Sequence, residues 1–401
     1  MTRLSPGDFA KSPNPLARQY ARFRVTERVL LTGHSHQAWP DVAFEGQAEA
    51  WNDAATHVDQ KWERAMKMAD RVRRGYARLM GARPEEVALG QNTHELVVRF
   101  LSALPLAERP RLVTTDGEFH SLRRQMDRLA EERILEVVKI PALPVDTLAE
   151  RLAAEVNGRT AAALVSSVLY GSAQIVPGLR AAAAACRRVG AELVVDAYHH
   201  LNVVPFSLER EGLADAFVVG GGYKYCQLGE GNAFLRVPPH GAELRPRLTG
   251  WFCEFARLTK RNEGEVAYAD GPLRWAGATY EPASHYRAAK VFEFFVAQGL
   301  TPELLRAVSQ HQVGRLVQGF DALRLDPARA SRDRDVPLDR IGGFLALRSP
   351  ESAAIAAGLR ERGVWTDYRG DIVRLGPAPY LSDAQLDTAI EALGAVVHKS
   401  N

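Results

Sequence analysis

Cysteine and long apolar runs are both scarce in this chain. It has only three cysteines, none in a paired spacing, which excludes a disulfide framework and a cysteine-based zinc site. No stretch approaches the roughly 18 apolar residues that a membrane span needs, and residues 1–23 lack the apolar core of a signal peptide. We therefore expect a cytoplasmic protein with no membrane partner and no metal.

An excess of charge of one sign is also lacking. Acidic and basic residues are interspersed and give a net charge of +3. The densest basic group, Arg71, Arg73, Arg74 and Arg78, has the spacing of the solvated face of a helix. Because no long basic run is present, we expect no nucleic-acid partner.

Short apolar runs that alternate with helical patterns are abundant. With 401 residues and 46% hydrophobic content, the chain can bury a large core, most simply as two domains. Alternating strands and helices at this spacing are typical of βαβ units. We predict an α/β fold with a mostly parallel seven-stranded sheet flanked by helices. The predicted strands are residues 87–91, 111–115, 135–140, 162–168, 192–197, 216–220 and 232–237, with helices at 96–104, 145–156 and 178–189.

A smaller α+β unit is predicted after Pro282. Residues 284–298 have helical spacing, and a second helix begins at Thr301, which is followed by proline. The other predicted elements are strands at 342–348 and 371–375 and a helix at 352–362.

These patterns predict a division of the chain into three parts. Residues 1–45 form an amino-terminal arm that contributes to the active site and to the small domain. Residues 46–280 form a large ligand-binding domain, and residues 281–401 form the small domain. Residues 245–277 show no periodicity, and we interpret them as active-site loops.

One lysine, Lys224, stands among glycines and aromatics in residues 220–231. A partly desolvated amine loses its proton easily and can form a Schiff base, although a lysine in such a hairpin is more often solvated. Asp196 lies at the carboxyl end of the predicted strand 192–197, at the edge where open α/β sheets bind ligands. Alone, it could equally cap a helix. Together they are the two groups that pyridoxal phosphate needs, an amine for its aldehyde and a carboxylate for its ring nitrogen.

The motifs around these residues resemble those of kynureninase, in the class V, fold-type I group of pyridoxal-phosphate enzymes. The chain has Asp-x-x-His at Asp196 and Tyr-Lys-Tyr-x-Gln-x-Gly-x-Gly from Tyr223. Three further segments resemble motifs of the same family: Thr32 to Ser35, Gly250 to Glu254 and Arg374 to Tyr380. The resemblance covers most of the chain and implies the fold-type I architecture and a homodimer with shared active sites.

The resemblance also implies roles for individual residues. Arg374 is expected to hold the α-carboxylate of an amino-acid substrate, with His34 and Ser35 nearby. The expected cofactor contacts are Asn92 and Thr93 for the phosphate, Tyr223 and Trp251 as further phosphate donors, Phe119 stacked on the ring, Ser166 and His199 at the phenolic oxygen, and Thr279 from a neighbouring subunit. From the residues alone, Asn92 and Thr93 could simply cap a helix, Phe119 could belong to the core, and His199 could be structural.

The activity implied is hydrolysis of the Cβ–Cγ bond of kynurenine, or of a related aryl-ketone amino acid, to an anthranilate and alanine in tryptophan catabolism. In that reading Lys224 removes the α-proton, Asp196 keeps the ring nitrogen protonated, and Tyr223 donates a proton. The chain departs from the family pattern at Leu169 and His34, which replace asparagines, and at Leu122, which replaces an aspartate. These departures bear on the substrate more than on the cofactor.

Other functions stay open at this point. A different class V activity, such as aminotransfer, β-elimination or epimerisation, would use the same cofactor residues. A desulfurase is disfavoured because residues 254–401 contain no cysteine. A regulatory cofactor-binding protein without activity would not need Lys224, Asp196 and Arg374 together. His34, His36 and His57 could form a different substrate pocket or be ordinary polar residues.

Overall fold

The structure is a computed structural model that describes residues 4–257 and 264–399. Its largest unit is a seven-stranded sheet of order β2-β8-β7-β6-β5-β3-β4, in which β8 is antiparallel to both neighbours and the other pairs are parallel. This confirms the predicted mostly parallel α/β sheet. The strands are β2 (Val87–Gly90), β3 (Arg111–Thr115), β4 (Glu136–Ile140), β5 (Thr160–Ser166), β6 (Glu192–Asp196), β7 (Phe217–Gly221) and β8 (Ala233–Arg236).

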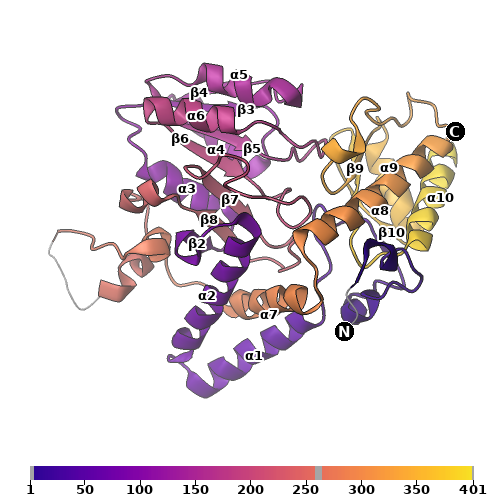
Figure 1. Cartoon of the computed structure of the whole chain (residues 1–401), viewed down its shortest axis with the longest axis horizontal. Coiled ribbons are helices and arrows are strands. Elements are labelled where there is room, and N and C mark those ends of the chain that lie inside the picture. Colours follow the sequence, from indigo (N-terminus) through magenta and orange to yellow (C-terminus); the bar gives the residue numbers. More distant parts are fainter. Residues whose placement is uncertain (1–3, 258–263, 400–401) are drawn as a thin grey trace.

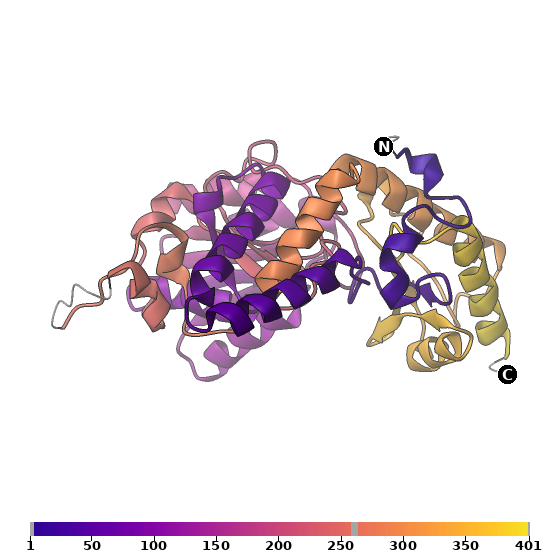
Figure 2. The same ribbon diagram turned by 90° about the horizontal axis from the view of Figure 1, so that it is seen from below.

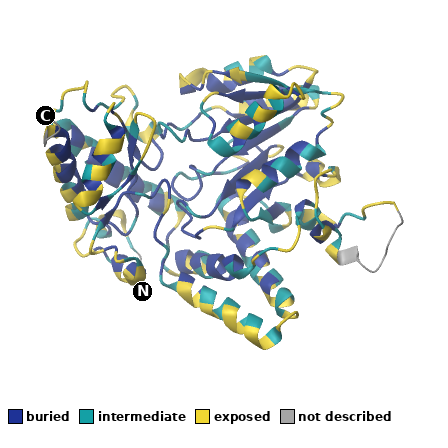
Figure 3. Cartoon of the chain, turned by 180° about the vertical axis from the view of Figure 1, so that it is seen from behind, coloured by how far each residue is buried: buried dark blue, intermediate teal, exposed yellow. Residues whose placement is uncertain are grey.

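Helices cover both faces of this sheet because successive strand residues point to opposite sides. Leu112 and Val194 pack in one core with α3 (Thr93–Ala103) and α4 (His120–Glu131). Val113 and Val195 pack in a second core, which contains residues of α2, α5 and α6. These three helices span Lys61–Met80, Leu148–Glu155 and Arg180–Val189. Figure 3 shows the buried strands between helices whose outer faces are exposed.

A second, three-stranded antiparallel sheet of order β11-β12-β9 lies beside the large one (Figure 1). Its strands are β9 (Leu345–Arg348), β11 (Asp367–Arg369) and β12 (Ile372–Leu375), and the helices near it are α8 (Pro302–Ala322), α9 (Ser352–Glu361) and α10 (Asp383–Lys399). The long helices α1 (Val42–His57) and α7 (Ala283–Ala297) pack against each other. In the view from below, α7 and α8 lead from one part to the other (Figure 2).

The amino-terminal arm is hydrogen-bonded to the carboxyl-terminal part of the chain. β1 (Val29–Leu30) pairs in parallel with β10 (Val364–Trp365), and both termini lie on that side of the molecule (Figure 1). The predicted three-part division is compatible with this pairing, but its boundaries stay a prediction.

The helix start predicted at Thr301 is confirmed, because the Thr301 hydroxyl accepts a hydrogen bond from the Leu304 backbone N–H. The aperiodic segment 245–277 forms short 3₁₀ helices at Trp251–Arg257 and Gly271–Trp275, while residues 258–263 lie outside the described residues. Within the described ranges, no helix has the length and apolar character needed to cross a membrane.

The carboxyl ends of four neighbouring strands meet at one edge of the large sheet. β3, β5, β6 and β7 are mutually parallel, so the loops that follow them converge. Residues singled out from the sequence lie in these loops or at the strand ends that precede them.

Candidate active site

Asp196 and Lys224 come from adjacent parallel strands. Asp196 is the last residue of β6, and Lys224 follows the end of β7. Both side chains are almost fully buried, with 5% and 4% of their surface exposed. The carboxylate and the amine therefore interact electrostatically in a desolvated setting, which strengthens the effect of each charge on the other.

Burial lowers the pKa of Lys224 to about 7, because a charged amine is disfavoured away from water. The negative charge of Asp196 opposes this shift, and the positive charge of Arg374 adds to it. Lys224 Nζ lies 2.6 Å from His199 Nε2, and burial holds the pKa of that imidazole well below its usual range. A substantial share of Lys224 is thus uncharged at neutral pH and can act as a nucleophile or base.

The Asp196 carboxylate is held in place by the backbone. Its Oδ1 accepts a hydrogen bond of 2.9 Å from the Tyr198 N–H. Burial raises its pKa, whereas that hydrogen bond and the charge of Lys224 lower it. The glycines before Lys224 give room to neighbouring side chains, since a Cβ at Gly221 would overlap the Tyr198 ring.

A cavity of about 250 Å³ lies at this edge of the sheet, lined by Asp196, Tyr198, Tyr223, Phe119 and the start of α3. Phe119 is half-buried directly before α4, and its ring centre lies 5.0 Å from Lys224 Nζ. It belongs to the cavity wall and not to either core cluster. Burial and, to a smaller extent, the negative charge of Asp196 raise the pKa of Tyr223. This phenol therefore keeps its proton at neutral pH.

The start of α3 provides donors for an anion. Asn92 caps the helix, and its Oδ1 accepts a 3.0 Å hydrogen bond from the Glu95 N–H. Thr93 is buried, and its hydroxyl has no hydrogen-bond partner among the described residues. An unpaired buried hydroxyl is costly, and together with the free N–H groups of a helix start it suits a phosphate. Thr93 is thus better placed to contact an anion than the cap Asn92.

Glu118 is a site residue that sequence reasoning missed. Its carboxylate accepts hydrogen bonds from the hydroxyls of Thr115 and Ser166, both at 2.6 Å. Burial, which outweighs these hydrogen bonds, raises the pKa of Glu118 to about 7, and the nearby Asp196 contributes. The Ser166 hydroxyl donates a hydrogen bond to the Glu118 carboxylate. It can donate to a phenolic oxygen instead only when Glu118 is protonated and donates its own hydrogen bond to Ser166.

We predict that Glu118 makes stability depend on pH. The folded pKa lies above the ordinary value of 4.5, so the stabilisation from this group is complete below pH 4.5 and is lost as pH rises through about 7. The loss amounts to about 3 kcal/mol at ~1.4 kcal/mol per pKa unit. Glu118→Gln keeps the shape of the protonated form. It is therefore expected to match the wild type in urea unfolding at pH 4.5 and to exceed it at pH 8.

Glu85→Gln, which neutralises an exposed carboxyl, is the control and is expected to leave the pH dependence of wild-type stability in place. Identical pH profiles for Glu118→Gln and the wild type would contradict the prediction.

Arg374 lies on β12, opposite Asp367 of β11, and is 3% exposed. Its Nε and Nη2 donate to the two Asp367 oxygens at 3.0 and 2.6 Å. Its Nη1 donates to the Tyr170 carbonyl at 3.1 Å. His34 Nε2 lies 2.7 Å from Asp367 Oδ1, and Ser35 bonds the Thr32 carbonyl. Asp367 was not predicted, although opposite charges facing each other across the hairpin could have indicated the pair.

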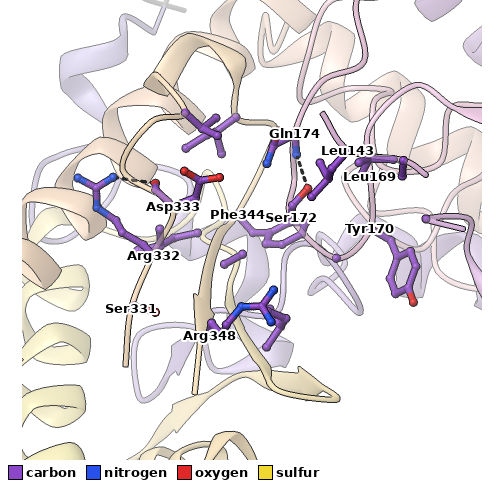
Figure 4. A pocket seen from close by; sticks show the side chains of 18 of the residues that line it. Leu143, Leu169, Tyr170, Ser172, Gln174, Ser331, Arg332, Asp333, Phe344 and Arg348 are labelled. Atoms are coloured by element: carbon purple, nitrogen blue, oxygen red, sulfur yellow. Dashed lines mark hydrogen bonds between the residues drawn. The ribbon is translucent and has the colours of Figure 1, made fainter. Parts of the chain in front are cut away.

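A larger cavity of about 540 Å³ has Tyr170 in its wall. The Tyr170 ring contacts Phe119, which lines the smaller cavity, edge to face with ring centres 5.4 Å apart. Figure 4 shows Leu143, Leu169 and Tyr170 on one side of this cavity, Arg332 and Asp333 on the other, and Phe344 between them. The Phe344 ring, which lines this cavity, also lies near Arg374 and His34.

The comparisons with known proteins agree with this arrangement. Residues 323–393, which include Arg374, match the family model of the kynureninase C-terminal domain. A kynureninase of Deinococcus radiodurans is 26% identical, over 99% of this chain and 98% of its own length. The chain is kynureninase-like. An uncharacterized aminotransferase of Bacillus subtilis, YcbU, is 23% identical, over 86% of this chain and 89% of its own.

The kynureninase-like chain also shares its fold with solved structures. A mutant of C-DES, with glycine covalently linked to its pyridoxal-phosphate cofactor, superposes with a TM-score of 0.83 at 17% identity, over 95% of this chain and 99% of that one. This likeness confirms the fold-type I architecture predicted from the sequence.

Two expected phosphate contacts lie outside the smaller cavity. The Trp251 indole donates a 3.2 Å hydrogen bond to the Thr279 hydroxyl, and neither residue lines the cavity formed by this one chain. The phosphate roles of Trp251 and Thr279 stay predictions.

The departures from the family pattern have different surroundings. Leu122 is fully buried in the core around α3 and α4, so it does not face the site. Leu169 lines the larger cavity. His34 is tied to Asp367. His57 is the last residue of the 16-residue helix α1, and the interpretation of His34, His36 and His57 as one pocket stays a prediction.

Proposed function

We propose that this chain is a pyridoxal-phosphate-dependent enzyme of the kynureninase type. It would cleave the Cβ–Cγ bond of kynurenine or a related aryl-ketone amino acid, giving an anthranilate and alanine. The observation that carries the proposal is the buried Lys224, which lies 5.0 Å from the ring centre of Phe119 and interacts electrostatically with Asp196 and Arg374. Asp196 and Phe119 line one cavity.

The residues present fit the cofactor. Lys224 would bind the aldehyde carbon covalently, and Asp196 would pair with the ring nitrogen. Phe119 would stack on the ring, and the unpaired Thr93 hydroxyl at the start of α3 would bind the phosphate. When bound, pyridoxal phosphate supplies an electron sink that stabilises negative charge at the substrate α-carbon.

The side chains then have distinct tasks. Arg374 would bind the α-carboxylate with the N–H groups that Asp367 and Tyr170 leave free. Lys224 would be freed from the aldehyde carbon when the substrate amine replaces it, and its Nζ would then take the α-proton. Burial, which lowers its pKa to about 7, leaves this amine able to accept a proton. Tyr223 keeps its phenolic proton at neutral pH and would donate it to the leaving fragment. The larger, mostly apolar cavity beside Tyr170 has room for the rest of the substrate.

The second candidate is another class V activity, such as aminotransfer, on a different amino acid. It is favoured by the similarity to a protein named as an aminotransferase and by Leu169, which puts an aliphatic side chain in the larger cavity where the family pattern has an asparagine. The cofactor residues and Arg374 would serve both activities. The proposal further includes a homodimer, in which Trp251 and Thr279 reach the partner's site, and a cytoplasmic role in tryptophan catabolism.

A substrate panel separates the two candidates. The holoenzyme is incubated with kynurenine, 3-hydroxykynurenine and L-alanine plus a keto acid, and the release of fluorescent anthranilates is followed. The proposal predicts anthranilate release in step with alanine. Consumption of alanine and keto acid without anthranilate release would establish the aminotransferase instead.

We predict that Arg374→Ala raises the KM about 10- to 100-fold, because charge-assisted hydrogen bonds to a carboxylate are lost. It should also lower kcat, since the substrate is no longer oriented. Arg374→Lys keeps the positive charge beside Asp367 but lacks the planar set of N–H groups that binds a carboxylate with two hydrogen bonds. We therefore expect changes in KM and kcat between those of the wild type and Arg374→Ala. Steady-state kinetics measure both. Arg362→Ala, an exposed arginine at the end of α9, is the control, and unchanged kinetics in Arg374→Ala would refute the carboxylate role.

A further inference from the structure

The free donors of Arg374 are fixed by its neighbours. A guanidinium has five N–H groups. Three are used: Nε and Nη2 on the two oxygens of Asp367, and Nη1 on the Tyr170 carbonyl. Among the contacts of the described residues, this leaves one N–H on each terminal nitrogen. That is the number a carboxylate can bind with two parallel hydrogen bonds.

Asp367 is in turn held in place by a second residue, His34. His34 Nε2 lies 2.7 Å from Asp367 Oδ1, and burial lowers the pKa of His34 to about 4, so the ring is neutral and its Nε2–H donates. A Cβ at Gly376 would overlap the His34 ring, and Phe344 packs on it with ring centres 4.9 Å apart. His34 therefore has no room to turn away from Asp367.

Asp367 also stays charged. Burial works against its charge, but the hydrogen bonds from His34 and Arg374 outweigh it and hold the pKa of Asp367 well below its usual range. Arg369 Nη2 lies 3.5 Å from Oδ2, and Lys224 also interacts electrostatically with this carboxylate. Asp367 is therefore ionised at neutral pH and pairs there with Arg374.

We propose that Asp367 is the positioning residue of the carboxylate site: it holds the Nε–Nη2 edge of Arg374 so that only the remaining two N–H groups face the cleft. The inference rests on the proposed function, which makes Arg374 the carboxylate anchor. It assigns Asp367 a role that depends on the ligand, because only ligands with an α-carboxylate use those two N–H groups.

Two small probes separate this role from a merely structural one. L-Alanine carries both the amine and the carboxylate, whereas ethylamine has the amine alone. Each is titrated into the protein loaded with pyridoxal phosphate, and the dissociation constant is read from the change in the cofactor absorption. Asp367→Asn is expected to weaken L-alanine binding about 10- to 100-fold, the equivalent of one or two charge-assisted hydrogen bonds, and to change ethylamine binding less than about twofold.

Matched variants keep the test decisive. Asp371→Asn removes the same charge from the same hairpin, where Asp371 pairs with the exposed Arg348, and should change neither constant. Asp367→Glu retains the charge, and so the pairing of the buried arginine, but displaces the guanidinium by one methylene. This variant is expected to weaken the binding of L-alanine, to a smaller extent than Asp367→Asn, and to leave the binding of ethylamine unchanged. It replaces Asp367→Asn in the test if that variant does not fold.

The outcomes are distinguishable. Equal weakening of L-alanine and ethylamine, or no change in either, would overturn the positioning role while leaving the proposed function intact. A wild type that takes up no pyridoxal phosphate would overturn the proposed function and this inference with it.

Discussion

Lys224→Ala is expected to give a folded, colourless protein whose activity is reduced at least about 10³-fold. The reason is that one amine serves as both covalent attachment point and base, and acid–base catalysis alone contributes ~10²–10⁴-fold. Folding should survive, because the replacement removes a buried group whose charge is already disfavoured by burial. The measurement is the absorption spectrum of protein reconstituted with pyridoxal phosphate, together with turnover of the substrate identified by the panel.

The control for this variant is Lys67→Ala, which removes an exposed lysine of α2 that pairs with Glu63. It should keep both the colour and the activity of the wild type. If Lys224→Ala retains the absorption band and full turnover, another amine holds the cofactor and the site is misassigned.

Asp196→Asn is expected to retain the cofactor and yet lose about 10²- to 10³-fold in kcat, the range typical of removing one preorganised electrostatic contact. The asparagine oxygen can still accept the Tyr198 N–H, so the geometry should persist. What disappears is the negative charge that would keep the ring nitrogen protonated. Turnover and the amount of bound cofactor are measured on the same preparation.

The same variant also affects the lysine. Asp196 raises the pKa of Lys224, so its loss should lower that pKa further, which a pH titration of the cofactor-free protein can follow. Asp215→Asn, a half-exposed carboxylate paired with Arg187, serves as the control. Turnover in Asp196→Asn within a few-fold of wild type would contradict the role of Asp196.

The large sheet could be predicted from the sequence because its strands are short, apolar and buried. The run that ends in Asp196 has β-branched residues and is buried along its length except for its first residue, so its bounds were predicted to within one residue. By contrast, β11 (Asp367–Arg369) was not predicted. Tyr368 and Arg369 are exposed, so the strand has no apolar alternation to reveal it.

Part of the site was likewise predictable. Lys224, Asp196, Phe119 and Thr93 all follow strands of the large sheet, and parallel strands bring their carboxyl ends to one edge. Glu118 and Asp367 could not be assigned in the same way. Each has a partner far away in the sequence, Ser166 for Glu118 and His34 for Asp367, and no local pattern signals those contacts. Only the pairing of Asp367 with Arg374 across the hairpin had a local signal.

The central claim is that pyridoxal phosphate is bound covalently to the amine of Lys224. The most direct test is to reduce the reconstituted protein with borohydride, digest it, and locate the fixed cofactor by peptide mass spectrometry. The account predicts the added mass on the peptide that contains Lys224 and on no other lysine. An unmodified Lys224, with the cofactor absent or attached to a different lysine, would contradict it.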